Sequence, residues 1–342
     1  MTTNNRQPTS KMKPYKNTGT AALLLAALMI TAGAGTALGQ TIPIETVKIS
    51  GVNNADGPAY GHSNVNQVGY GAVSYDYYIG TKEVTNAQYA QFLNAVASQS
   101  DTYALYNTNM AITRMGSEES YTYTTTDPDK PVVYVTFWNA ARFCNWLTSG
   151  ETETGVYDFA AVGSPVNPTN NTINRDADAW AAGGWALPTE DEWYKAAYYD
   201  VKEDKYWLFP TGKDTIDSSD ANYYRWGYSS ALKNVGSYAA NQNGIFDIAG
   251  NAEEWIDAIY YTGNRTYRGG SIGGASNFLE STAGGGAHPD ERPTEIRFHR
   301  GFRVVVFSLT SVPEPGTYAA ATGLAMLVIG MWLRRGHRAG HG

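Results

Sequence analysis

Cysteine is nearly absent from this sequence: its 342 residues include Cys144 and no other thiol. No disulfide can form within the chain, so packing or bound metal has to stabilise the fold. Basic residues are also in the minority, with 25 Lys and Arg against 32 Asp and Glu, and several of them lie close to the two ends. An acidic central part without a basic, aromatic-rich patch would repel nucleic acid, so we expect no nucleic-acid partner.

Internal repeats and low-complexity linkers are absent from the central part of the chain. The hydrophobic content of 42% is enough for one large core. Glycine is abundant, with 36 residues, and aromatic residues make up 13% of the chain. This composition is typical of many turns held by large rings rather than of long helices. We therefore predict one domain over residues 41–310.

The first forty residues carry the three parts of a secretory signal. Basic side chains come first, an apolar run over residues 21–30 follows, and small residues then lead to Gln40. This order predicts a signal peptide over residues 1–39 and export across the inner membrane. An uncleaved anchor is the alternative, but the apolar run is short for a membrane span and ends in small residues.

A second apolar segment lies near the C-terminus. Val312-Pro-Glu-Pro315 precedes the uncharged stretch Tyr318–Leu333, which as a helix would be about 24 Å long, just short of a bilayer core. Arg334 and Arg335 follow, and basic residues favour the cytoplasmic side of a membrane. We predict a transmembrane helix within residues 312–338. A buried helix of the domain is the alternative, which the flanking prolines disfavour.

Capping residues predict three helices. Thr85-Asn-Ala-Gln88 and Thr189-Glu-Asp-Glu192 have the spacing of a capping box. Between them, Thr136 precedes an apolar helical pattern that ends at Gly150. Cys144 lies on the apolar face of this pattern, so we expect a buried thiol rather than a catalytic one.

The other segments are predicted to be irregular. Residues 41–75 have a loosely alternating start and then a turn-rich loop. Residues 150–184 are polar and predicted to be looped. From residue 205 to about residue 307 the sequence indicates short extended pieces between glycine turns.

The stretch Asn243–Trp255 places two carboxylates in an otherwise apolar, glycine-interrupted segment. A buried carboxylate needs an arginine, a cation or several backbone N–H groups as partner. One hypothesis is a buried ion pair with Arg268 or Arg303. The other is a hard cation such as calcium, which takes mixed carboxylate and carbonyl oxygens. Its ligands would come from Asp247, Gly250, Ala252 and Glu254.

Seven short stretches stand out in order along the chain: Ile79–Tyr89, Pro131–Ala140, Leu187–Trp193, Val235–Tyr238, Gly244–Trp255, Arg268–Ser271 and Gly301–Arg303. Together they resemble the formylglycine-generating enzyme family, whose members are also called sulfatase-modifying factors, over roughly residues 70–307. The resemblance implies an α+β fold: a compact mixed domain with little regular secondary structure, related to C-type lectin-like domains.

The resemblance also implies structural calcium. One calcium site of the family matches Asp247, Gly250, Ala252 and Glu254. A second would begin at Asn222 and the carbonyl group of Tyr223, but its remaining ligands are not evident in this sequence. We therefore expect one calcium ion at the first of these sites.

The catalytic pattern of the family is missing. Its members hold copper with two cysteines spaced five apart after the Gly269-Gly-Ser271 motif, and aligned without gaps those positions are Gly274 and Leu279. Because thiolates are what hold copper(I), we expect no copper and no formylglycine formation.

The C-terminal segment resembles the PEP-CTERM sorting signal, with its Pro-Glu-Pro motif, membrane segment and terminal basic cluster. The resemblance implies recognition and cleavage by an exosortase, with membrane attachment before processing. We therefore expect a bacterial cell-envelope or surface protein.

Three classes of function remain open. The first, which we favour, is a non-catalytic surface module that binds a peptide or glycan in a glycine-rich concavity formed by Gly273, Gly274, Gly284, Gly285 and Gly286. The second is an oxidoreductase, either of the formylglycine-generating type or like a non-haem iron relative, with His288, Asp290 and His299 as candidate ligands. The third is a structural envelope protein whose acidic surface holds divalent cations between polysaccharide chains.

Overall fold

The computed structural model describes residues 42–51, 53–57, 69–168, 173–225, 231–261, 263–289 and 299–308, and these ranges belong to one compact unit. The predicted signal peptide over residues 1–39 and the predicted sorting segment over residues 312–338 lie outside the described residues. Within the described ranges, no helix is both long enough and apolar enough to cross a membrane.

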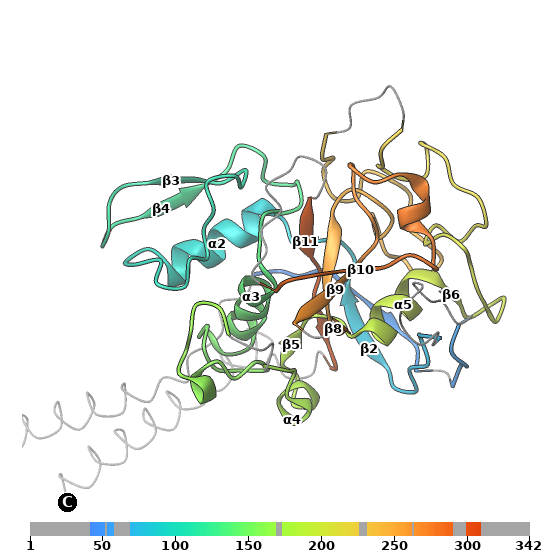
Figure 1. Ribbon diagram of the computed structural model, residues 1–342, viewed down its shortest axis with the longest axis horizontal. Coiled ribbons are helices and arrows are strands. Elements are labelled where there is room, and N and C mark those ends of the chain that lie inside the picture. The colour runs from blue at the N-terminus through green and yellow to red at the C-terminus, as the bar shows by residue number, and fades with distance from the viewer. Residues whose placement is uncertain are drawn as a thin grey trace, which may run out of the picture. The chain divides into compact units, whose positions relative to one another are not determined.

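The domain is a mixture of short helices and short strands, which confirms the predicted α+β class with little regular secondary structure (Figure 1). The helices are α2 (Asn86–Val96), α3 (Phe137–Ser149), η2 (Ala160–Val162), α4 (Ala177–Ala181), α5 (Glu190–Tyr198) and η4 (Ser276–Leu279). The strands are β1 (Thr46–Ile49), β2 (Tyr77–Gly80), β3 (Thr113–Met115), β4 (Thr122–Thr124), β5 (Trp185–Ala186), β6 (Tyr199–Asp200), β7 (Lys205–Tyr206), β8 (Glu253–Tyr261), β9 (Asn264–Arg268), β10 (Gly285–Ala287), β11 (Arg300–Phe302) and β12 (Val305–Val306).

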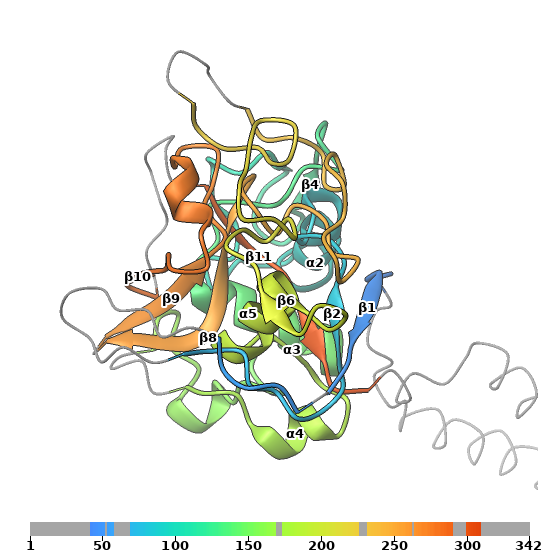
Figure 2. The ribbon, with the colours of Figure 1, turned by 90° about the vertical axis from the view of Figure 1, so that its right-hand side faces the viewer.

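Two four-stranded sheets organise the domain. One has the strand order β1-β2-β12-β5, and its strand pairs are antiparallel. The other has the order β10-β9-β8-β11, in which β11 runs parallel to β8 and the other pairs are antiparallel. In Figure 2, β8 and β9 lie side by side. Because β11 and β12 are consecutive along the chain, the segment around Arg303 connects the two sheets.

The three helices predicted from their caps are confirmed. Thr85 and Thr189 each form a full capping box, with Gln88 and Glu192 as the reciprocal partners. Thr136 accepts the N–H of Asn139 at 3.0 Å at the start of α3. The helix ends at Gly150, whose φ of 82° is readily adopted only by glycine.

The predicted loop over residues 150–184 contains a helix that the sequence analysis missed. Asp176 begins α4 by accepting the N–H of Ala179 at 2.7 Å. Trp180 anchors this five-residue helix, because its ring packs edge-on against Phe307 and the Arg175 guanidinium lies 3.7 Å from its centroid. One turn is too short for a helical hydrophobic period, so only the cap residue signalled it.

Aromatic rings fill the core, as the composition predicted. Four tryptophans from α3, α5 and β8 are fully buried: Trp138, Trp146, Trp193 and Trp255. A smaller cluster lies apart from the main one and consists of Phe209, Ala221, Tyr223, Ala249 and Leu279. Since Leu279 ends η4, this small cluster supports the loop between β9 and β10.

Candidate functional site

The carboxylate of Glu254 is bound by an arginine. Arg303 donates from Nε to Oε2 at 2.7 Å and from Nη2 to Oε1 at 2.6 Å, and both side chains are at least 99% buried. Trp193 adds a third donor, 2.7 Å from Oε2. Of the two arginines predicted as partners, Arg303 is therefore the partner of Glu254. Arg268 instead pairs with Glu190.

Asp247 lies in a strained turn at the other end of this stretch. Its φ is 52°, in the left-handed region that non-glycine residues seldom adopt. Oδ2 accepts the N–H of Gly236, whereas Oδ1 is buried without a hydrogen-bond partner among the described residues. Burial raises the pKa of this carboxyl, and hydrogen bonds from the backbone of Gly236 and Tyr238 and the charge of Arg303 lower it in part.

Glu83, on the loop after β2, is a second buried carboxylate with a free oxygen. Its Oε1 accepts from Asn251 Nδ2 at 3.0 Å, while Oε2 has no partner in the described part of the chain. Burial and then the nearby charge of Asp247 raise the pKa of Glu83 well above its ordinary value. Each of these two carboxylates therefore has one oxygen without a hydrogen-bond donor, and a cation between them would be stabilised.

The backbone around Gly250 is fixed by Asn222. A Cβ at Gly250 would collide with the Asn222 carbonyl oxygen, and the φ of Gly250 is 76°, so glycine is required here. Asn222 Nδ2 donates to Asn251 Oδ1 at 3.1 Å. The two loops named by the family resemblance are therefore adjacent in space.

The described residues contain no group of three or more His, Cys, Asp or Glu side chains arranged to hold a metal. With Glu254 bound by Arg303, the carboxylate oxygens that remain are on Asp247 and Glu83, and these fit a hard cation with carbonyl ligands. Glu83 also lines a cavity of about 460 Å³ together with Glu45, Lys82 and Asp129. Calcium held by Asp247, Gly250, Ala252 and Glu254 stays a prediction.

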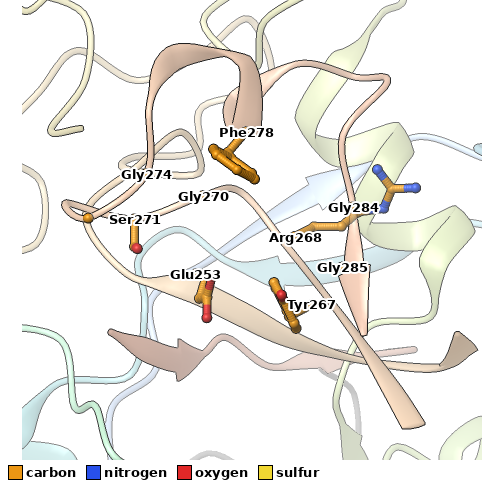
Figure 3. A pocket seen from close by; sticks show the side chains of 10 residues that line it. Glu253, Tyr267, Arg268, Gly270, Ser271, Gly274, Phe278, Gly284 and Gly285 are labelled. Carbon is orange, nitrogen blue, oxygen red and sulfur yellow. The ribbon is translucent and has the colours of Figure 1, made fainter. Parts of the chain in front are cut away.

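A separate pocket of about 270 Å³ lies between β9, η4 and β10. Four of the five glycines predicted to form a concavity line it, and Gly286 does not. The side chains around it are Glu253, Tyr267, Arg268, Ser271 and Phe278. In Figure 3, Ser271 and Glu253 lie at one end, and the guanidinium group of Arg268 points away from Phe278 and Tyr267.

Glycine residues, which have no side chain, shape this pocket. A Cβ at Gly285 would collide with the ring of Tyr267, the residue opposite it in the β9–β10 ladder. A Cβ at Gly274 would lie 3.4 Å from Cδ2 of Phe278, which is ordinary contact. The Tyr267 ring thus lies directly over the backbone of β10, and this arrangement requires glycine at position 285.

The charges at the pocket are already paired inside the protein. Arg300 donates to Glu253 Oε1 from Nε at 2.9 Å and lies over the ring of Tyr267, 4.0 Å from its centroid. Arg268 donates to Glu190 and, from Nη1, to the carbonyl oxygen of Ala283 at 2.7 Å. The pocket therefore presents fixed polar groups with little net charge.

The family's two copper positions fall at or beside this pocket. Gly274 lines it, and Leu279 is fully buried in the small apolar cluster. Cys144 is buried in α3 and is not one of the lining residues, and burial raises its thiol pKa well above the ordinary value. A thiol of this kind is unreactive.

The candidate iron ligands receive no support from the described residues. His288 is exposed next to β10, whereas His299 is largely buried and its pKa is lowered by that burial. Asp290 lies outside the described residues.

Sequence reasoning missed Glu83 and Phe278. Glu83 stands in the quoted stretch Ile79–Tyr89, where a charged residue before Val84 in an apolar setting was the available signal. Phe278 had no signal, because a lone aromatic residue in a loop is as often buried as exposed. Long-range pairing also hid the partner of Glu253, since Arg300 is distant along the chain.

Comparisons with known proteins identify the fold and the family of this chain. The crystal structure of CarF superposes with a TM-score of 0.55 over 77% of this chain and 98% of CarF, at 24% identity, which shows a shared fold. The serine/threonine-protein kinases pkn1 of Chlamydia caviae and Chlamydia pneumoniae are 26% and 25% identical over 189 and 224 residues, which are 54% and 65% of this chain. These matches cover 23% and 29% of the kinases, so this chain corresponds to less than a third of either. A family model, "Sulfatase-modifying factor enzyme 1-like domain", matches residues 59–307. The chain therefore belongs to the sulfatase-modifying factor enzyme family.

Proposed function

We propose that this protein is a non-catalytic binding module of the cell envelope, and that its ligand, a peptide or glycan, occupies the pocket between β9, η4 and β10. The lining of that pocket carries the proposal: among the described residues it consists of glycines, two aromatic rings, Ser271 and internally paired charges, without a thiol or imidazole. Such a lining supplies shape and hydrogen bonds but no group that holds copper(I) or activates oxygen.

Exposure of Phe278 supports a role in binding. Its side chain is 58% exposed at the edge of the pocket, although an isolated soluble domain gains nothing from exposing a ring there. Aromatic side chains at such positions contribute large contact areas at a small entropy cost.

Calcium has a structural part in the proposal. Asp247 and Glu83, each with one carboxylate oxygen that lacks a donor, would hold the ion together with backbone carbonyl groups of the loop. Bound calcium would neutralise the two carboxylates and fix the loop that leads into β8. Since β8 carries Glu253, the ion would stabilise one wall of the pocket without contacting the ligand.

Export and sorting complete the proposal and rest on the order of sequence features at the two ends. The predicted signal peptide would direct the chain across the inner membrane. The predicted sorting segment would be recognised by an exosortase-type enzyme and would hold the protein in the membrane until it is cut.

A combined glycan and peptide array tests the binding proposal. The full chain and its Phe278→Ala variant are labelled and applied to the same array, with Ile259→Ala as a control for loss of an exposed apolar side chain on β8 outside the pocket. We expect at least one class of ligand to bind the wild type and the control but not Phe278→Ala. Equal binding by the wild type and Phe278→Ala, or no binding at all, would overturn the proposal.

A further inference from the structure

Phe278 offers a flat apolar face to the pocket. Its side chain is more exposed than any other large apolar side chain in the described ranges, and it lies on the side of Gly274 where a Cβ would point. Figure 3 shows the ring above the cavity, with Tyr267 on the opposite side. A ligand with a flat face of C–H groups would cover this ring and bury the apolar surface that it exposes.

Hydrogen-bonding groups gather at one end of the same cavity. Ser271 and Glu253 lie there (Figure 3). Arg300 contacts Oε1 of Glu253 from both Nε and Nη2, at 2.9 and 2.8 Å. Glu253 is therefore held in place at the wall of the cavity, and a carboxylate is a hydrogen-bond acceptor.

Arg300 is itself immobilised. Its guanidinium lies 4.5 Å from the ring centroid of Trp255 and 4.0 Å from that of Tyr267. A polar group that is fixed before the ligand arrives loses little entropy on binding. The cavity therefore combines an open aromatic face, which can contact apolar groups of a ligand, with a preorganised acceptor, which can bind its hydroxyl groups.

We propose that this pocket binds a neutral pyranose ring, with the apolar face of the sugar on Phe278 and its hydroxyl groups directed to Glu253 and Ser271. This inference rests on the proposed function and specifies its ligand as a glycan.

The size of the pocket favours a single ring. A cavity of about 270 Å³ is slightly smaller than the ~300–1,000 Å³ typical of sites for drug-sized molecules. One sugar unit of a longer glycan, either internal or terminal, would fill it.

The paired charges and the polar groups of the pocket disfavour ionic ligands and aromatic side chains of peptides. The carboxylate of Glu253 and the guanidinium of Arg268 are each paired inside the protein, so an ionic ligand would find little net charge. An aromatic side chain of a peptide would cover Phe278 but would bury Glu253 and Ser271 against apolar atoms, which is costly for polar groups. A pyranose has both an apolar face and a rim of hydroxyl donors.

Titration of the full chain by saturation-transfer NMR tests this proposal. The probes are methyl β-D-glucopyranoside, methyl β-D-galactopyranoside and N-acetylphenylalanine amide. We expect at least one pyranoside to bind, and Phe278→Ala to weaken it about threefold to tenfold, as expected for loss of one ring contact. Phe278→Trp should retain the affinity, and Ile259→Ala should leave it unchanged. Melting curves establish that each variant is folded.

Three outcomes would overturn the sugar assignment: no pyranoside binds, pyranoside binding is unaffected by Phe278→Ala, or only N-acetylphenylalanine amide binds in a Phe278-dependent way. The array separates this failure from failure of the binding module. Phe278-dependent peptide ligands on the array would retain the module and exclude the sugar, whereas an array without any Phe278-dependent ligand would exclude both.

Discussion

Arg303 donates to both carboxylate oxygens of Glu254, from Nε to Oε2 at 2.7 Å and from Nη2 to Oε1 at 2.6 Å. Both side chains are almost completely buried. Removing one charge of such a pair leaves the other buried without compensation, which typically costs about 3–5 kcal/mol. Glu254→Gln should therefore lower the free energy of unfolding by about that amount in a urea titration.

The matched control for this prediction is Asp76→Asn. Asp76 pairs with Lys48 on the surface, where both side chains are about half exposed. Solvent screens exposed pairs, so this variant should unfold close to the wild type. A loss below about 1 kcal/mol for Glu254→Gln would mean that the Arg303 pair does not hold the two sheets together.

Glu83 gives the domain a predicted pH dependence in the absence of calcium. Its folded-state pKa lies well above the ordinary value of 4.5, because of burial and the charge of Asp247. The folded state then binds more protons than the unfolded state, so stability falls as pH rises above about 4.5. Relative to Glu83→Gln, the wild type should lose up to about 1.4 kcal/mol per pH unit, measured by urea unfolding in chelator.

Calcium should offset the loss of stability that the wild type shows relative to Glu83→Gln in chelator. A cation bound only by the folded state stabilises it by about 2.7 kcal/mol at one hundred times its Kd. The wild type should gain melting temperature with calcium, and Glu83→Gln should gain less. Glu45→Gln is the control, because Glu45 lines the same cavity but is largely exposed. If calcium shifts none of the three, the calcium proposal is wrong.

Local signals in the sequence predicted local structure. Thr85, Thr136 and Thr189 begin helices because a cap needs only residues within one turn. The glycine-rich concavity was also predicted, since most of its lining comes from two nearby stretches. Glu83 and Asp247 are far apart in sequence, and no pattern within either stretch encodes their approach. The same holds for Phe278, whose exposure depends on how η4 packs on the small apolar cluster.

Processing at both ends is expected to define the mature protein. Intact mass of the protein recovered from its native envelope should fit a chain that begins near Gln40 and ends near Pro315. The order of basic, apolar and small residues at the start, and of Pro-Glu-Pro, apolar and basic residues at the end, motivates this expectation. Recovery of the full-length chain would refute it.

The central claim is that this pocket binds a ligand and does not oxidise one. The most direct measurement is incubation of the full chain with copper(I), a reductant, oxygen and a sulfatase-type cysteine peptide, followed by peptide mass. We predict that the peptide mass stays unchanged in the wild type and in Cys144→Ser. Oxygen-dependent conversion of the cysteine to an aldehyde would contradict the account, and its persistence or loss in Cys144→Ser would show whether that thiol performs the reaction.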